Sequence, residues 1–305
     1  MSTALIYFYY VLPLITLPQE ANPVSDWKVL NEGFIRIQYH AYDTDIADLV
    51  YLVIKKNFDR TAEMVGYGGP AIANIVISGS EDEYNLFTGN RMPTWSQGST
   101  DYENSRIVLK SPSFTGIRES ELRRTVIHEF THFLIGAVAP PSSVPRWFNE
   151  GVAMYLGGAE TFRSKINISA AIYTKSLISL NEIQYLMTFS GDRANLAYAE
   201  SRAAIEYLIE ITDEKSIRFI LAELYLNKSF ESAFTEVTGM EPIDFEIEFR
   251  TVIRQRYRFY FLAAVGDYIW FLIPGLFILA YLAVKIRNMQ TIRRWKIEEE
   301  QDEFE

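Results

Sequence analysis

An apolar stretch near the C-terminus restricts the fold of this chain more than any other feature of its sequence. It covers residues 259–284 (FYFLAAVGDYIWFLIPGLFILAYLAV), where the only charged side chain is Asp267. As a helix, these 26 residues extend about 39 Å, which exceeds the roughly 30 Å hydrocarbon core of a bilayer. The stretch therefore predicts a transmembrane helix at 259–284. The alternative is a core helix of a soluble domain.

A shorter apolar stretch lies at the N-terminus. It runs from Ala4 to Leu17 (ALIYFYYVLPLITL), and the first charged side chain of the chain is Glu20. A run of this length is too short for a membrane span and is typical of the apolar region of a signal peptide. We interpret residues 1–22 as a signal peptide, although a basic segment before the run and an Ala-x-Ala cleavage site are both missing. The alternative is a buried N-terminal strand or helix.

The two apolar stretches together predict the topology. Four arginines lie between 250 and 258, and five basic residues lie between 285 and 296, so the positive-inside rule only slightly favours a cytoplasmic C-terminus. A cleaved signal peptide gives the same orientation. We therefore expect a single-pass protein of the cell membrane, with an extracytoplasmic domain at 28–250 and a cytoplasmic tail at 285–305. The alternative is a cytoplasmic domain anchored by its tail, which requires that residues 1–22 are not a signal peptide.

The composition excludes several kinds of site. The chain has no cysteine, which rules out thiolate metal sites, disulfides and a cysteine nucleophile, and it has only three histidines. The net charge of -10 argues against a nucleic-acid partner, because phosphate-backbone binding needs a basic face. Any function built on imidazole must therefore use His40, His128 or His132.

Between the apolar stretches, the pattern of apolar residues changes along the chain. It predicts a helix at Asp45–Val65, ending at Gly66, and strands at Phe34–Tyr39, Ala73–Ser78 and Arg106–Lys110. The segment between the second and third strands is rich in Gly, Ser, Asn and Pro and is interpreted as a long loop. Helical patterns dominate from Glu119 onward. This order predicts an α+β fold, with a small N-terminal mixed sheet and helices followed by a mostly helical part.

The sequence HEFTH provides the strongest functional signal. It lies in Glu121–Gly136, which we expect to be a helix with Ser120 as its N-cap and a glycine at its end. Residues four apart on a helix project from one face, so His128 and His132 can occupy two positions of a tetrahedral zinc site. Glu129 lies about 100° round the helix from the first histidine, where it can hold a metal-bound water instead of the metal. The alternative is a helix with two half-buried histidines.

Two histidines leave a catalytic zinc site incomplete, because such a site needs a third protein ligand and an open position. His40 lies far upstream, after a strand, and is expected to be a surface or core residue. A second helix, Pro145–Leu156, supplies a carboxylate: Glu150, 18 positions after His132. The loop between the helices permits an antiparallel return that brings this carboxylate to the metal. Its apolar neighbours indicate a partly buried setting, where a carboxylate needs a partner. The alternative is an exposed helix carboxylate.

The motifs HEFTH and WFNEG, at this spacing, resemble the gluzincin zinc peptidases, and among them the peptidase MA-like domain proteins. The resemblance covers most of residues 30–250 and implies a gluzincin-like peptidase domain at 28–250 with a thermolysin-like zincin lobe. It implies one catalytic Zn²⁺ held by His128, His132 and Glu150, with Glu129 as general base and acid. It also implies that Tyr198, at the start of a helix, stabilises the oxyanion, and the alternative is a packing tyrosine.

The sequence departs from the family pattern at two places. The Gly-x-Met-Glu-Asn signature of aminopeptidases is absent, and Gly98–Asn104 (GSTDYEN) is a poor imitation, so exopeptidase specificity is not implied. Thermolysin-like enzymes have an acidic residue four positions after the ligand glutamate, where this chain has Met154. The group that orients a histidine must therefore come from elsewhere, and Asn149 is a candidate. The resemblance also implies that the strand Arg106–Lys110 forms the edge with which an extended peptide pairs.

These patterns predict a membrane-anchored zinc-dependent metallopeptidase that hydrolyses peptide bonds with a zinc-activated water and a glutamate base. Its expected partners are a peptide or protein substrate and the membrane lipid around 259–284, and the sequence carries no signal of an oligomeric state. The competing hypothesis is a non-catalytic zinc- or peptide-binding ectodomain with the same membrane anchor.

Overall fold

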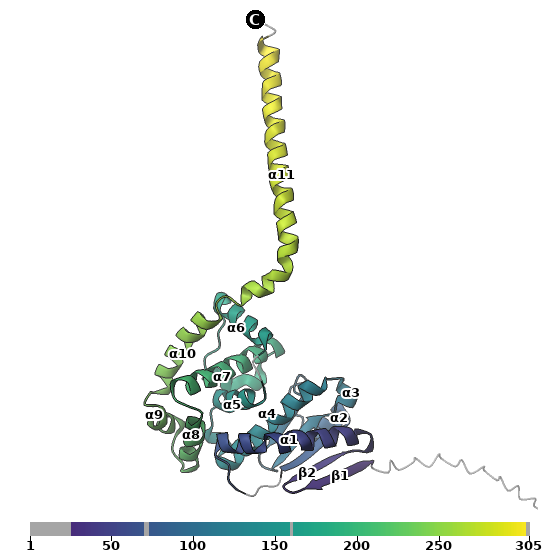
Figure 1. Ribbon diagram of the computed structural model, residues 1–305, viewed down its shortest axis with the longest axis vertical. Coiled ribbons are helices and arrows are strands. Elements are labelled where there is room, and N and C mark those ends of the chain that lie inside the picture. Colours follow the sequence, from purple (N-terminus) through teal and green to yellow (C-terminus); the bar gives the residue numbers. More distant parts are fainter. Residues whose placement is uncertain (1–25, 70–72, 159–160, 303–305) are drawn as a thin grey trace, which may run out of the picture.

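The computed structural model describes residues 26–302, apart from 70–72 and 159–160, so the predicted signal peptide at 1–22 lies outside the described residues. A small sheet with helices, a helical lobe and one long C-terminal helix follow one another along the chain (Figure 1), which confirms the predicted α+β arrangement. The strands are β1 (Trp27–Glu32), β2 (Ile35–His40), β3 (Ala73–Ser78), β4 (Gly98–Asp101) and β5 (Arg106–Lys110). The α-helices are α1 (Thr44–Val65), α2 (Glu81–Thr88), α3 (Pro112–Thr115), α4 (Glu119–Val138), α5 (Arg146–Leu156), α6 (Phe162–Thr174), α7 (Gly191–Ile211), α8 (Lys215–Tyr225), α9 (Phe230–Thr238), α10 (Pro242–Tyr257) and α11 (Phe261–Asp302). Short 3₁₀ helices lie at Ala41–Asp43, Pro141–Ser143 and Glu182–Thr188.

The sheet has the strand order β1-β2-β3-β5-β4, with β2, β3 and β5 parallel and the two outer strands antiparallel to their neighbours. Parallel neighbours need a crossover, which α1 provides between β2 and β3. Ile37, Ile75 and Ile107 lie side by side in register on the three parallel strands and are at most 1% exposed. They belong to the core that α1 and α4 complete, so the sheet and α4 are held in a fixed relation.

Most of the predicted N-terminal elements are confirmed. β2, β3 and β5 agree with the predicted strands within one residue, and α5 agrees with the predicted helix Pro145–Leu156, with the proline directly before it. α1 ends at Gly66, whose φ of 76° lies in the left-handed region that glycine adopts readily.

The prediction of a long loop between β3 and β5 is wrong, because this segment contains α2 and β4. α2 has only eight residues, and Ser80 caps it by accepting a hydrogen bond from the Glu83 N–H. β4 is short and polar, and it forms because its backbone pairs antiparallel with β5. Neither element has the apolar periodicity that identifies helices and strands in a sequence. Since β4 covers β5, the expectation that Arg106–Lys110 forms the free edge is also wrong, and β4 is the edge strand.

The helix that carries HEFTH, α4, is longer than predicted at both ends. It begins earlier, with Arg118 and not Ser120 at the N-cap, and the Glu121 carboxylate accepts a hydrogen bond from the Arg118 N–H at 3.2 Å. Gly136 lies inside the helix and not at its end. A Cβ at this position would come within 2.3 Å of the Tyr102 ring, so the glycine makes room for Tyr102 against the helix.

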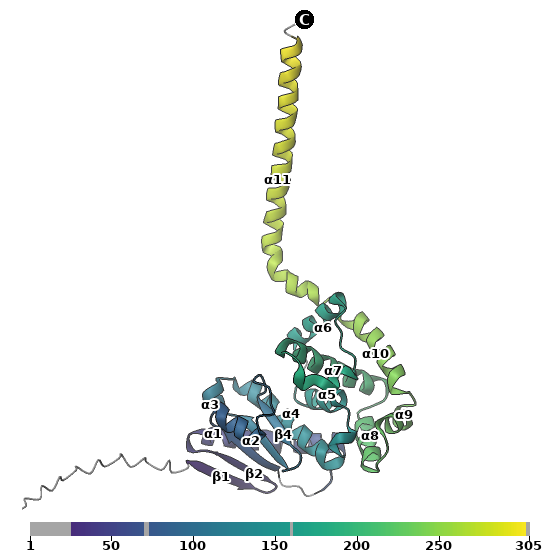
Figure 2. The same cartoon turned by 180° about the vertical axis from the view of Figure 1, so that it is seen from behind.

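The C-terminal helix α11 has 42 residues, is separated from α10 by three residues and extends away from the lobe (Figures 1 and 2). Within it, the 24-residue segment Leu272–Trp295 is long and apolar enough to cross a membrane, and it is not buried against the rest of the structure. This candidate span overlaps the stretch 259–284 identified in the sequence.

The helical lobe contains a buried carboxyl group, Glu200 on α7, which is 1% exposed. Both of its oxygens accept from the backbone N–H of Ile178, at 3.2 and 3.1 Å. Burial raises the pKa of Glu200 from 4.5 to about 8, against the lowering effects of that hydrogen bond and of Arg250. The folded protein therefore holds this proton more tightly than the unfolded chain does.

We expect the free energy of unfolding to decrease as the pH rises from 4.5 to about 8, because deprotonation of Glu200 favours the unfolded chain in this range. The contribution of this group is at most about 5 kcal/mol. Glu200→Gln keeps an acceptor for Ile178 but has no proton to lose, so the variant should be less sensitive to pH and more stable than the native protein near pH 8. Denaturant unfolding across this pH range measures the effect, with the exposed Glu231→Gln as control. Equal pH dependence in both variants would contradict the assignment.

Candidate metal centre

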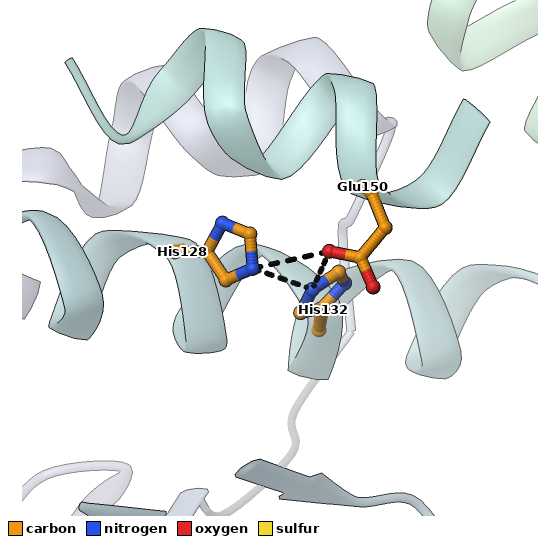
Figure 3. Close-up of side chains that lie close together, drawn as sticks. All are labelled: His128, His132 and Glu150. Carbon is orange, nitrogen blue, oxygen red and sulfur yellow. Dashed lines mark hydrogen bonds and ion pairs between the residues drawn. The ribbon is translucent and has the colours of Figure 1, made fainter. Parts of the chain in front are cut away.

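α5 crosses back over α4 and brings a carboxylate to the two histidines of HEFTH (Figure 3). The Nε2 atoms of His128 and His132 lie 3.0 Å apart, and each is 3.2 Å from Oε2 of Glu150. The side chains point toward one another between the two helices, and His132 and Glu150 are buried. The structure thus brings together the three residues that the family resemblance implies as ligands. Among the described residues, no other group of this kind has the spacing of a metal site.

The three donor atoms suit a zinc ion. Ligand atoms of a tetrahedral zinc with bonds of about 2.0–2.1 Å lie about 3.3 Å apart, close to the spacing of this triangle. Oε2 of Glu150 is buried and, despite its closeness to both rings, makes no hydrogen bond of acceptable geometry. The other oxygen, Oε1, lies 3.0 Å from Nε of Arg146 in an ion pair. Two imidazole nitrogens and one free carboxylate oxygen are a donor set of catalytic zinc sites.

Electrostatic interactions keep the Glu150 carboxylate ionised. Burial would raise its pKa, but the charge of His132 and the contacts with His128 and Arg146 lower the pKa well below the usual value. Burial would likewise lower the pKa of His132, but Glu150 outweighs this effect and raises the pKa. The carboxylate is therefore an anion at neutral pH, which is the form that binds a metal.

A hydrogen-bonded chain orients one of the two imidazole rings. The Nδ1–H of His132 donates to Oδ1 of Asn149 at 2.7 Å, and this contact orients the ring with Nε2 on the side of Glu150. Nδ2 of Asn149 donates in turn to the Tyr102 hydroxyl at 3.1 Å, and burial raises the pKa of Tyr102 to about 12. Asn149, the candidate named from the sequence, thus makes the hydrogen bond that orients His132.

Glu129 lies beside the triangle, on the side that faces the sheet. Its Oε2 accepts a hydrogen bond from the Thr100 hydroxyl on β4 at 2.8 Å, and the residue is 7% exposed. β4 approaches this side chain closely at Gly98, where a Cβ would lie 2.7 Å from Cγ of Glu129. The edge strand therefore fixes the orientation of this carboxylate, and Gly98 provides the space for it.

Tyr198 lies in the second turn of α7 and not at the start of a helix as predicted, because α7 begins at Gly191. Gly191 and Asp192 are weak helix formers, so the sequence gives little indication that a helix begins here. The acidic residue in the first turn is nevertheless favourable for the helix dipole. The ring of Tyr198 lies 6.0 Å from that of His128 between centroids. Burial raises the pKa of Tyr198 well above 10, so the phenol is neutral and can donate a hydrogen bond.

These side chains surround a cavity of about 550 Å³ between the edge strand β4 and the helices α4, α5 and α7. The lining residues that the sequence analysis missed include Thr100, Tyr102 and Arg146. Arg146 precedes Glu150 by four positions, a spacing at which ion pairs form on a helix. The sequence could therefore have predicted this contact. The other two residues lie on or next to β4, for which the sequence has no periodic signal.

The third histidine, His40, takes no part in this centre. It lies at the end of β2, where Nε2 is 2.9 Å from the Glu83 carboxylate and the ring stacks on Tyr42 with centroids 5.2 Å apart. This agrees with its interpretation as a residue of the surface or core.

Comparison with known proteins identifies the family. The model of the Peptidase MA superfamily matches residues 93–255, which is more than half of the chain. The matched segment includes β4, α4, α5 and α7, and so contains every residue of the centre. No curated protein matches the chain. The match thus covers His128, His132 and Glu150 together with the strand and helices around them, and the chain belongs to the Peptidase MA superfamily.

Proposed function

We propose that the protein is a membrane-anchored zinc-dependent metallopeptidase. The observation that carries this proposal is the convergence of His128, His132 and Glu150 on one point, with Glu129 beside them in the same cavity. The family match supports a peptidase-like domain and hence a peptide or protein substrate.

The residues have distinct roles in this proposal. His128, His132 and Glu150 hold Zn²⁺, which supplies Lewis-acid polarisation of a carbonyl group and of water. The Glu129 carboxylate, positioned by the Thr100 hydroxyl, accepts the proton of the attacking water and later passes it to the leaving amine. The neutral phenol of Tyr198 donates a hydrogen bond to the tetrahedral oxygen.

The edge strand β4 offers a binding surface for the substrate. It lines the cavity and has a neighbour on one side only, so its outer backbone groups are available to an extended peptide, apart from the Gly98 carbonyl, which accepts from the Tyr84 and Ser96 hydroxyls. Strand addition of this kind holds a peptide through main-chain hydrogen bonds that are independent of its sequence.

The domain arrangement follows from the same proposal. Residues 28–250 form the peptidase domain, the stretch 259–284 within and just before α11 enters the membrane, and 285–305 lie on its other side. We place the domain outside the cytoplasm and the tail inside, in line with the weak charge bias and the proposed signal peptide at 1–22.

Metal analysis combined with peptide cleavage tests the proposal. The purified full chain should contain a single zinc ion and cleave members of a random peptide library, and a chelator should abolish cleavage until zinc is restored. A zinc-loaded protein that cleaves no peptide would support the alternative, a non-catalytic zinc- or peptide-binding domain. A protein that binds no zinc would contradict both.

A further inference from the structure

Two segments of the chain hold basic residues without any acidic ones. Residues 162–175 (FRSKINISAAIYTK) cover α6, and residues 249–262 (FRTVIRQRYRFYFL) cover the second half of α10 and the start of α11. Together they contain seven Lys and Arg residues and no Asp or Glu, although the whole chain has a net charge of -10. Such a local excess of positive charge in an acidic protein indicates a surface for a negatively charged partner.

The two segments meet where α11 leaves the lobe. The Phe261 N–H donates to Oγ of Ser169 at 2.9 Å, and the Phe261 ring packs against Tyr173 with centroids 4.2 Å apart. The rings of Tyr260 and Phe162 pack with centroids 6.1 Å apart. These contacts fix α6 beside the base of α11, at the end of the lobe away from the sheet (Figures 1 and 2).

The joint surface exposes aromatic rings and cations together. Phe162, Tyr173 and Phe259 are 57%, 53% and 60% exposed. Acidic residues from outside the two segments pair with Arg250 and Arg256. Within the part of the chain that the structure describes, no carboxylate forms an ion pair with Arg163, Lys175, Arg254 or Arg258. Aromatic rings and basic side chains side by side are what proteins present to the headgroup layer of a membrane.

We propose that these two segments form a membrane-facing surface that binds anionic lipid headgroups of the bilayer that α11 enters. The cations bind lipid phosphates, and the aromatic rings enter the headgroup layer. The proposed span 259–284 begins within the second segment and continues along α11, so a bilayer around that span lies directly next to this surface. The inference rests on the membrane span in the proposed function and is independent of zinc binding and hydrolysis.

The acidic end of the chain is not an alternative occupant of this surface. Residues 298–302 (EEEQD) lie at the far end of α11, and a helix of 42 residues is about 63 Å long. A span that crosses a bilayer places this acidic end on the opposite side. Lipid binding also explains why arginines at 250–258 precede the span, where they nearly cancel the charge bias that sets orientation.

Site-specific labelling of the full chain in vesicles tests the inference, because the natural sequence has no cysteine to compete with the label. Ala170→Cys places a fluorophore on the exposed face of α6 that also carries Arg163 and Tyr173. Leu52→Cys is the matched control: it is 56% exposed and lies on α1, which packs on the sheet. With nitroxide-labelled headgroups in phosphatidylglycerol-containing vesicles, quenching at 170 should exceed quenching at 52 by at least about threefold. The excess should shrink in pure phosphatidylcholine and at high salt.

Charge reversal separates lipid binding from simple proximity. A triple variant should lose most of the excess quenching when it carries Arg163→Glu, Arg254→Glu and Arg258→Glu. A control with the same change of net charge, far from α11, should keep the excess: Arg36→Glu, Lys55→Glu and Lys56→Glu. Equal quenching of the two labels, or no effect of the first triple variant, would overturn the proposal. A chain that does not float with vesicles would overturn it together with the membrane span, whereas zinc content in the same samples reports on the metal centre alone.

Discussion

A Glu129→Gln protein is expected to bind zinc as the native protein does and to hydrolyse peptides with a kcat/KM lower by about 10²–10⁴-fold. Glutamine has nearly the same shape and can still accept the Thr100 hydrogen bond, so the centre should keep its geometry. Its amide oxygen, however, cannot take a proton from water and return it to the leaving amine. Metal analysis and kinetics on the same preparation measure both parts of the expectation.

The matched control for this variant is Glu119→Gln. That carboxylate lies in the first turn of the same helix, is exposed and pairs with Arg123, so its loss should leave hydrolysis nearly unchanged. Full activity of a zinc-loaded Glu129→Gln protein would exclude this residue as the base.

A Glu150→Gln protein is expected to lose zinc itself. The substitution replaces an anionic donor by a neutral amide and removes the ion pair of Arg146, so zinc affinity should fall by more than the roughly 10–100-fold typical of losing an outer partner of a ligand. Hydrolysis should fall in parallel, because the weakened site no longer holds zinc when the concentration of free zinc is low. Competition with a chelator of known affinity measures the change.

The exposed Glu236→Gln, on the surface of α9, serves as control for this second variant and should bind zinc normally. Unchanged zinc affinity in Glu150→Gln would mean that the third ligand lies elsewhere. The two variants together separate the proposed functions, since a peptidase loses activity in both, whereas a non-catalytic zinc protein changes only its metal content in the second.

The parts of the centre that lie within one helix could be predicted from the sequence, and the parts that depend on the packing of distant elements could not. The spacing of His128 and His132 follows from the pitch of one helix. The position of Glu150 depends on the return of α5 over α4, for which spacing allowed the arrangement and family resemblance supplied the assignment. Thr100 and Tyr102 reach the site through β4, whose four residues form a strand only because β5 pairs with them.

The same distinction applies to the fold. α1 and the three parallel strands have apolar residues at the spacing expected for one buried face, and the sequence predicts their ends within one residue. The beginnings of α4 and α7 were misplaced, because arginine is not a residue type preferred at N-caps and the first residues of α7, Gly191 and Asp192, are weak helix formers. The interior location of β5 in the sheet could not be known without β4.

The three residues between α10 and α11 limit how far the domain with its cavity can move relative to α11. A flexible linker of that length spans only about 10 Å, and the packing of Phe261 on α6 restricts it further. With the proposed membrane span, a domain tethered so tightly samples a thin layer above the bilayer, not a wide hemisphere. Its effective concentration is therefore high for peptide segments presented at the surface of the same bilayer and low for those far from it. For the proposed peptidase, reach as well as chemistry would select the peptides that are cut.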